Sequence, residues 1–145
     1  MIDSIVRKVT DSYLETALWA EHNYDSEEDD SVSEHFDGDY CVSDFTDEAR
    51  SKAEADCAEL LNLLDDVHIT EDETLLDRAD SLQSYERIGH DFWLTRNGHG
   101  AGFWDGDYHD RNDDVDYGDA ITDIVKANFS ECHIWADDDG GVYLD

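Results

Sequence analysis

Proline is absent from this 145-residue chain, and positively charged residues are scarce. Average usage of about 5% would predict several prolines. Only three Lys and six Arg oppose 28 Asp and 12 Glu, which leaves a formal net charge of −31. Small soluble domains usually carry a net charge of about 2–8 in magnitude. A surface this acidic repels anionic lipid and DNA itself, so we expect neither membrane nor nucleic acid as a direct partner, and instead a cationic one.

Cysteine is sparse, and no long apolar run occurs. Cys41, Cys57 and Cys132 are odd in number and widely spaced, without a CxxC pair. This pattern argues against a disulfide framework and favours a reducing cytosol. No segment approaches the roughly 20 apolar residues of a membrane span, and the N-terminus lacks a signal-peptide core. We therefore expect a cytoplasmic protein.

What the chain does contain is enough apolar material for a core. Hydrophobic residues make up 39% of it, including four Trp, seven Tyr and five Phe. A disordered acidic tail would lack these aromatic residues. The length is typical of one domain, so residues 1–145 are predicted to fold as a single acidic α+β domain.

Four segments show helical spacing of apolar residues. The first has a stripe that begins at Ile2, with apolar side chains three and four positions apart. Thr46 is a suitable N-cap for the second, and Thr70 with Glu73 forms a capping box for the third. The expected helices are residues 1–20, 46–64, 70–82 and 121–129.

The spacing changes after Gly89, and two hairpins are predicted. Phe92–Thr95 are strand formers, Asn97–Gly100 is a turn signal, and residues 102–104 would return. Residues 132–135 and 142–144 would pair around an Asp- and Gly-rich turn. The expected fold is α+β, with amphipathic helices packed on a small antiparallel sheet built from these two C-terminal hairpins.

One segment resembles a known group of proteins. Residues 89–105 read GHDFWLTRNGHGAGFWD, which is similar to a motif in small proteins of tailed phages. In those proteins, as here, a helix precedes the motif, and a helix and a closing hairpin follow it. The resemblance covers roughly the C-terminal two-thirds of the chain. It implies a viral accessory protein in the cytoplasm of the host cell and carries no known activity with it.

Two acidic stretches, 21–47 and 105–119, suggest how such a protein could act. B-DNA presents one negative charge per ~1.7 Å of its axis, and its binders gain affinity by releasing counterions. A rigid array of carboxylates can occupy the same basic cleft of a host defence or repair protein. The two stretches would be supplemented by five further acids, Asp65, Asp66, Glu71, Asp72 and Glu73. The predicted partner-binding residues are Asp25, Glu27, Glu28, Asp29, Asp30, Glu34, Asp37, Asp39, Asp105, Asp107, Asp110, Asp113, Asp114 and Asp116.

A second hypothesis explains the same charge without a partner. An excess of Asp over Glu and few Lys are also typical of proteins that function in concentrated salt. At 1 M salt the Debye length falls to about 3 Å, and self-repulsion nearly vanishes. The acidic coat would then serve solubility in a viral accessory or structural protein. Carboxylates concentrated on one face favour mimicry of DNA, and an even coat favours salt adaptation.

Catalytic and metal-binding motifs are not recognisable. Residues 105–116 match the EF-hand register poorly: His109 stands at position five, Asp110 replaces the glycine and Asp116 the final glutamate. The seven His and three Cys lack metal-ligand spacing. Four aromatic residues are expected to pack in the core and not to form a base-stacking platform, because the surrounding charge would repel phosphate; one of them could stay exposed and anchor a protein partner. The four are Phe92, Trp93, Phe103 and Trp104. We therefore expect no enzyme and no cofactor.

Overall fold

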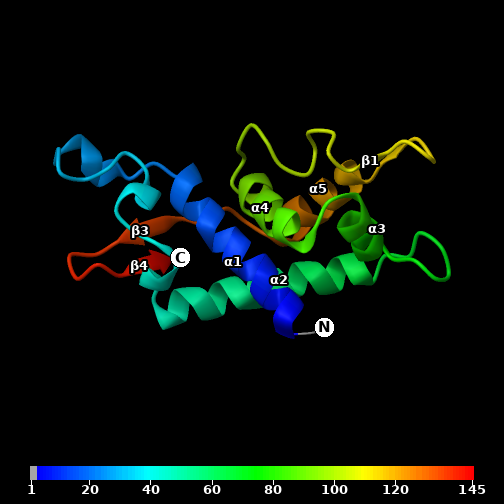
Figure 1. Ribbon diagram of the computed structural model, residues 1–145, viewed down its shortest axis with the longest axis horizontal. Helices are drawn as coiled ribbons and strands as arrows, with labels where there is room; N and C mark the ends of the chain where they lie inside the picture. Colours follow the sequence, from blue (N-terminus) through cyan, green and yellow to red (C-terminus); the bar gives the residue numbers. More distant parts are fainter. Residues whose placement is uncertain (1–2) are drawn as a thin grey trace.

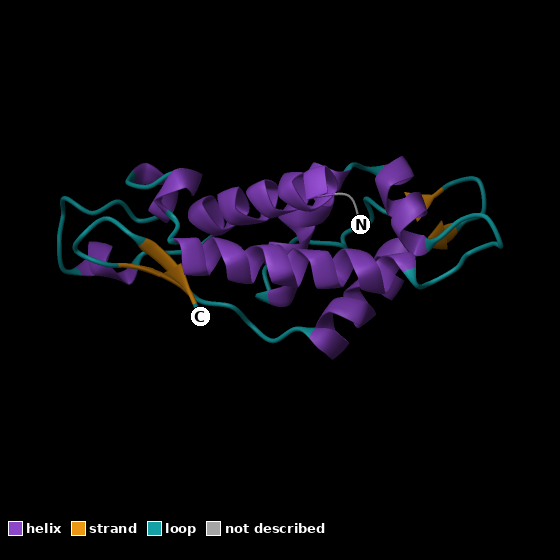
Figure 2. Ribbon diagram, turned by 90° about the horizontal axis from the view of Figure 1, so that it is seen from below, coloured by secondary structure: helices purple, strands orange, loops and turns teal. Residues whose placement is uncertain are grey.

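The computed structural model describes residues 3–145, so Ile2, where the first predicted stripe begins, lies outside the described residues. Helices fill the middle of an elongated molecule, and a small hairpin lies at each end (Figures 1 and 2). The expected α+β class is confirmed. The helices are α1 (Asp3–Ala20), η1 (Tyr24–Glu27), η2 (Phe36–Gly38), η3 (Val42–Asp44), α2 (Asp47–Asp65), α3 (Leu75–Leu82), α4 (Tyr85–Arg96) and α5 (Tyr117–Asn128), where η marks a 3-10 helix. The strands are β1 (His109–Asp110), β2 (Val115–Asp116), β3 (Ile134–Ala136) and β4 (Val142–Leu144).

The core lies where α1 packs against α4 and α2 (Figure 1). The apolar stripe of α1 is buried, with Val9, Tyr13 and Leu14 fully covered. Thr46 caps α2, because its hydroxyl accepts a hydrogen bond from the backbone N–H of Ala49 at 3.1 Å. The first two predicted helices are therefore confirmed where the structure describes them.

The hairpin predicted at residues 92–104 is wrong, because Phe92–Thr95 belong to helix α4. Ser84 caps this helix by accepting a hydrogen bond from the N–H of Arg87 at 3.0 Å. From Ile88 to Arg96 every residue except His90 is buried. A helix buried on all sides loses its amphipathic period, so its short apolar run looks like a buried strand.

The Asn97-Gly98 signal ends this helix and does not turn a hairpin. Gly98 has φ 72°, the left-handed conformation that helix C-termini commonly use. The N–H of His99 donates to the carbonyl of Leu94 at 3.0 Å, and that of Gly98 donates to Thr95 at 3.3 Å. These two bonds form a Schellman motif. The same dipeptide suits both a tight hairpin and a helix end, and only the burial of α4 distinguishes them.

The N-cap of the third predicted helix lies four residues later than expected, at Thr74 instead of Thr70. Thr74 and Asp77 form the capping box of α3: the Thr74 hydroxyl accepts from the Asp77 N–H, and the Asp77 carboxylate accepts from the Thr74 N–H. Thr70 and Glu73 lie instead in a tight turn, where the N–H of Ile69 donates to the carbonyl of Glu73 at 2.8 Å. This segment contains two possible capping boxes, Thr70 with Glu73 and Thr74 with Asp77. The first lies in the turn, and the second caps the helix.

Two antiparallel hairpins are present, and one of them lies where the sequence predicts it. β3 pairs with β4, with Trp135 opposite Tyr143. The other hairpin is formed by β1 and β2, with His109 opposite Asp116. The predicted fourth helix is confirmed as α5, which begins earlier because Asp116 caps it through the N–H of Gly118 at 3.0 Å.

Candidate partner-binding surface

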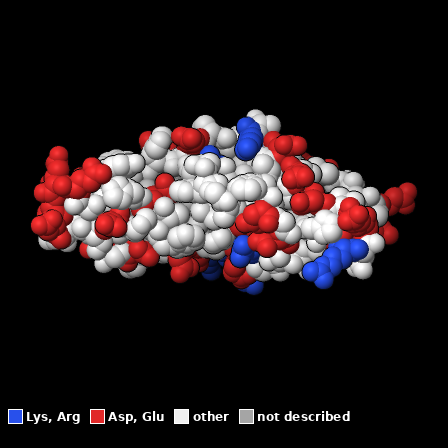
Figure 3. All heavy atoms as spheres, turned by 90° about the horizontal axis from the view of Figure 1, so that it is seen from above, with Lys and Arg blue, Asp and Glu red and all other residues white. Residues whose placement is uncertain are grey.

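The fourteen residues predicted to bind a partner belong to two chain segments, the loop between α1 and η3 and the hairpin β1–β2 with its approach, which lie toward opposite ends of the molecule (Figure 1). Acidic side chains crowd both ends of the face shown in Figure 3, and a broad uncharged area lies toward its middle. The loop group, between α1 and η3, comprises Asp25, Glu27, Glu28, Asp29, Asp30, Glu34, Asp37 and Asp39. The hairpin group, around β1 and β2, comprises Asp105, Asp107, Asp110, Asp113, Asp114 and Asp116.

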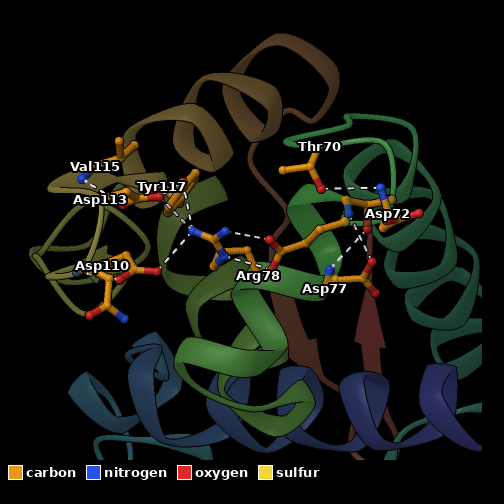
Figure 4. Close-up of polar contacts among 11 residues, drawn as sticks. Thr70, Asp72, Asp77, Arg78, Asp110, Asp113, Val115 and Tyr117 are labelled. Atoms are coloured by element: carbon orange, nitrogen blue, oxygen red, sulfur yellow. Dashed lines mark hydrogen bonds and ion pairs between the residues drawn. The ribbon is translucent and has the colours of Figure 1, made fainter.

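Arg78 of α3 binds two of the six members of the hairpin group, Asp110 and Asp113 (Figure 4). Its guanidinium lies 3.0 Å from a carboxylate oxygen of Asp110 and 2.8 Å from one of Asp113, and it also pairs with Glu73. It donates to the hydroxyl oxygen of Tyr117 at 2.9 Å, and that hydroxyl donates to Asp113. The hydrogen bond from Tyr117 and the contact with Arg78 lower the pKa of Asp113. These carboxylates are already occupied within the protein.

The other members of the hairpin group also have internal partners. Asp107 pairs with Arg87 at 2.7 Å, although partial burial and the nearby Asp105 raise its pKa. Asp114 lies 2.9 Å from the Nε2 atom of His109. Asp105 accepts from the Gly102 N–H at 3.3 Å, and Asp116 caps α5. All six side chains therefore hold the β1–β2 end together, which weakens their assignment to a partner.

The loop group is arranged differently, because all eight of its side chains are exposed and none pairs with Lys or Arg in the described chain. Asp29 accepts from the N–H and hydroxyl of Ser31, which lowers its pKa. Asp39 accepts similarly from Ser33, and Glu27 lies 3.6 Å from His22. These contacts are local and leave the negative charge of the loop group uncompensated.

The acidic loop is attached firmly to the helical core. The carboxylate of Glu21, at its start, accepts hydrogen bonds from the Trp93 indole at 2.9 Å and from His99. The carbonyl of Glu21 contacts the Nδ1 atom of His35 at 3.1 Å. Phe36 is buried in the core, 3% exposed. The loop group is therefore presented on a fixed backbone.

An acidic hollow of about 470 Å³ separates this loop from the turn between β3 and β4. Asp25, Glu28 and Asp29 line one side, and Asp137 and Asp138 line the other. From the sequence, Asp137 and Asp138 are predicted only as turn residues and not as part of the partner-binding surface. Their signal was a run of three aspartates at a turn, and the fold that brings that turn beside the loop was not visible in the sequence.

Asp137 is fixed by three hydrogen bonds. Its carboxylate accepts from the Tyr143 hydroxyl at 2.6 Å, from the Gly141 N–H at 2.9 Å and from the Asp139 N–H at 3.1 Å. The bond from Tyr143, followed by the backbone donors, lowers the pKa of Asp137. This aspartate therefore stays ionised in the hollow and also shapes the turn.

The preference for aspartate has a structural cause in many loops. Ten Asp side chains accept a hydrogen bond from a backbone N–H within residues 3–145, and no Glu side chain does. The Asp carboxylate is one methylene closer to the backbone, which suits turns and helix caps. The ten are Asp29, Asp39, Asp44, Asp77, Asp105, Asp110, Asp113, Asp116, Asp137 and Asp145.

The structure also locates the residues considered for metal binding, base stacking and catalysis. Across residues 3–145, no three His, Cys, Asp or Glu side chains converge to hold a metal ion. Phe92, Trp93 and Phe103 are fully buried, which confirms core packing for three of the four aromatic residues. Trp104 is 45% exposed and is the one of the four that stays outside the core. The buried Asp91 accepts from the Tyr108 hydroxyl at 2.7 Å and contacts His90 at 2.9 Å. Neither His90 nor Asp91 lines the acidic hollow.

The fold and this surface define a small helical α+β protein with an uncompensated acidic end. A comparison with protein-family models, curated proteins and solved structures finds no match for the chain. Among the described residues, no helix combines the length and apolar character needed to cross a membrane.

Proposed function

We propose that this protein is a viral accessory protein that binds the basic nucleic-acid cleft of a host protein and competes with DNA. The observation that carries the proposal is the loop group, eight exposed carboxylates without a Lys or Arg partner in the described chain. The resemblance of residues 89–105 to a phage motif supports a role in the cytoplasm of an infected cell. The protein would act by binding, without catalysis and without a cofactor.

Electrostatics supports a basic cleft as the partner. A rigid surface of one charge sign steers an oppositely charged partner toward it. A cleft that binds DNA releases counterions when phosphates enter, and an array of carboxylates offers it the same kind of exchange. The hydrogen bonds of Glu21 and the buried Phe36 fix the loop, which lowers the entropy cost of binding.

The exposed loop group, which has no Lys or Arg partner in the described chain, supports this proposal over an acidic coat for concentrated salt. The acids are not spread evenly over the face in Figure 3, where an uncharged area lies between two acidic ends. The excess of aspartate, which the salt hypothesis uses, follows in part from backbone capping by ten of these side chains.

The test is displacement of labelled DNA from purified host-type enzymes with basic clefts: a restriction endonuclease, an RNA-guided nuclease and a uracil–DNA glycosylase. The protein should raise the apparent Kd for DNA of at least one enzyme, and the effect should weaken steeply with salt. Failure to displace DNA from all three at low salt would contradict the proposal.

Two five-fold variants of equal charge localise the surface. The first neutralises loop-group acids, as Asp25→Asn, Glu28→Gln, Asp30→Asn, Glu34→Gln and Asp37→Asn. The control neutralises exposed acids outside the acidic stretches, as Asp3→Asn, Glu59→Gln, Glu86→Gln, Asp123→Asn and Glu131→Gln. The first variant should lose most of the competition and the control little. Single substitutions should each weaken it only slightly, because the carboxylates act collectively.

A further inference from the structure

A second hollow opens next to the acidic hollow, and aromatic side chains line it. It has a volume of about 330 Å³ and lies between the start of the acidic loop and β3. Tyr24, His22 and Trp135 are among its lining residues. The two hollows share Asn23, Asp25 and Ala136, so they form adjoining parts of one surface.

The aromatic rings of this hollow are exposed but held by neighbours. Trp135 is 48% exposed, and its ring stacks on Tyr143 with centroids 4.1 Å apart and planes 8° from parallel. Tyr24 is 73% exposed, and the His22 ring meets it edge-on at 4.7 Å. Trp135 of β3 and Tyr24 of η1 therefore contribute little to the core, and both rings line the hollow.

Unpaired carboxylates lie beside these rings. Asp25 lines both hollows, is exposed, and its carboxylate forms no hydrogen bond or ion pair with another described side chain or backbone group. Glu28 and Asp138 extend the negative charge across the adjoining hollow. Aromatic faces attract cations through their quadrupole, and a planar guanidinium can stack on a ring while its N–H groups bind a carboxylate.

We propose that the aromatic and acidic hollows together form a binding site for an arginine side chain of a basic partner protein. Tyr24 or Trp135 would stack on the guanidinium, and Asp25 would accept its hydrogen bonds. The ammonium group of lysine is a compact point charge and cannot stack in this way. The inference rests on the proposed function, and it adds that the surface distinguishes arginine from lysine.

The test compares octa-arginine and octa-lysine peptides, which carry the same charge, by calorimetry at 0.1 M salt. The matched variants are Trp135→Leu in the hollow and Trp104→Leu outside it, because these two indoles are 48% and 45% exposed. Tyr24→Leu serves as a second hollow variant, since its side chain packs little and its loss spares the fold. Thermal unfolding checks that each variant remains folded.

The wild-type protein should bind octa-arginine more tightly than octa-lysine. Trp135→Leu and Tyr24→Leu should each reduce that ratio by roughly two- to five-fold, the range for an exposed cation–π contact, with the octa-lysine affinity unchanged. Trp104→Leu should keep the wild-type ratio. Equal reductions in all three variants, or none in the hollow variants, would overturn the arginine site while both peptides still bind. If neither peptide binds even at low salt, the proposed function itself fails.

Discussion

Gly89 of α4 lies against the backbone carbonyl of Val9 in α1, and a Cβ atom at position 89 would fall far inside van der Waals contact with that carbonyl oxygen. Both residues are fully buried at the crossing of the two helices. A backbone group cannot move aside as a flexible side chain can. The glycine therefore sets the close approach of α1 and α4, around which the core is built.

Gly89→Ala should destabilise the protein. Alanine favours a helix interior over glycine by about 0.5–1 kcal/mol, but overpacking a core typically costs about 1–3 kcal/mol. We expect a net loss of about 1–2 kcal/mol in the free energy of unfolding, measured by urea denaturation. Gly100→Ala is the control, because nothing lies within 4 Å of its added Cβ. A Gly89→Ala protein as stable as wild type would contradict the close packing.

Arg78→Leu should destabilise the β1–β2 end. The substitution leaves Glu73, Asp110 and Asp113 close together without their shared cation. Hydrogen bonds to charged groups contribute about 1.5–3 kcal/mol, so we expect a loss of about 2 kcal/mol, partly recovered by added salt. Arg111→Leu removes an equal charge from an exposed residue without an ion pair in the described chain. Equal thermal stability of the two variants would rule out the Arg78 network.

Asp137→Asn should reduce stability at pH 7, and its difference from wild type should shrink in acid. The folded-state pKa of Asp137 lies below its ordinary value of 3.8. Its stabilising effect is therefore present above about pH 3.8 and is lost as the pH falls through the lower folded-state pKa. Unfolding measured from pH 7 to pH 2.5 checks this trend.

Asp138→Asn provides the matched control for that pH series. It removes the same charge from the next residue, which is exposed and whose carboxylate has no hydrogen bond within residues 3–145. Its stability difference from wild type should be small and should not follow the same pH profile. Parallel profiles for the two variants would mean that net charge, and not the hydrogen bonds of Asp137, determines the effect.

Thermal unfolding in potassium chloride distinguishes the proposed function from salt adaptation. We expect a folded protein at 10 mM salt, because the core and internal ion pairs need no screening. The melting temperature should rise by a few degrees toward 0.15 M, where the Debye length shortens from about 30 Å to 8 Å and repulsion within the loop group weakens. A protein that folds only in molar salt would support the acidic coat and remove the main support for competition with DNA.

The sequence predicts those elements whose signals are local. The stripe of α1 and the Thr46 cap of α2 suffice to place two helices, and the Asp- and Gly-rich turn places the β3–β4 hairpin. Helix α4 could not be recognised, because burial on every side removes the amphipathic period that identifies a helix. In the sequence, Gly89 also appeared to mark the end of the helical spacing, although it lies inside α4 where that helix crosses α1.

The candidate surface was predictable only in part, for a similar reason. The sequence displays a stretch without Lys or Arg around the loop group, but only the fold shows that no distant cation pairs with it in the described chain. The hairpin group looked equivalent, but its cations come from elsewhere in the chain: Arg78 lies 32 residues before Asp110, and Arg87 lies 20 before Asp107. Asp137 and Asp138 join the surface through the same kind of distant contact.

Backbone capping by aspartate makes charge and shape inseparable over part of this chain. Replacing a capping Asp by Glu keeps every unit of charge but moves the carboxylate beyond its N–H partner. Replacing it by Ala removes charge and cap together. A lineage that changed its acidity would therefore be free to do so at exposed, uncapped positions such as Glu59 or Asp123, whereas Asp116 and Asp137 would be retained at any net charge.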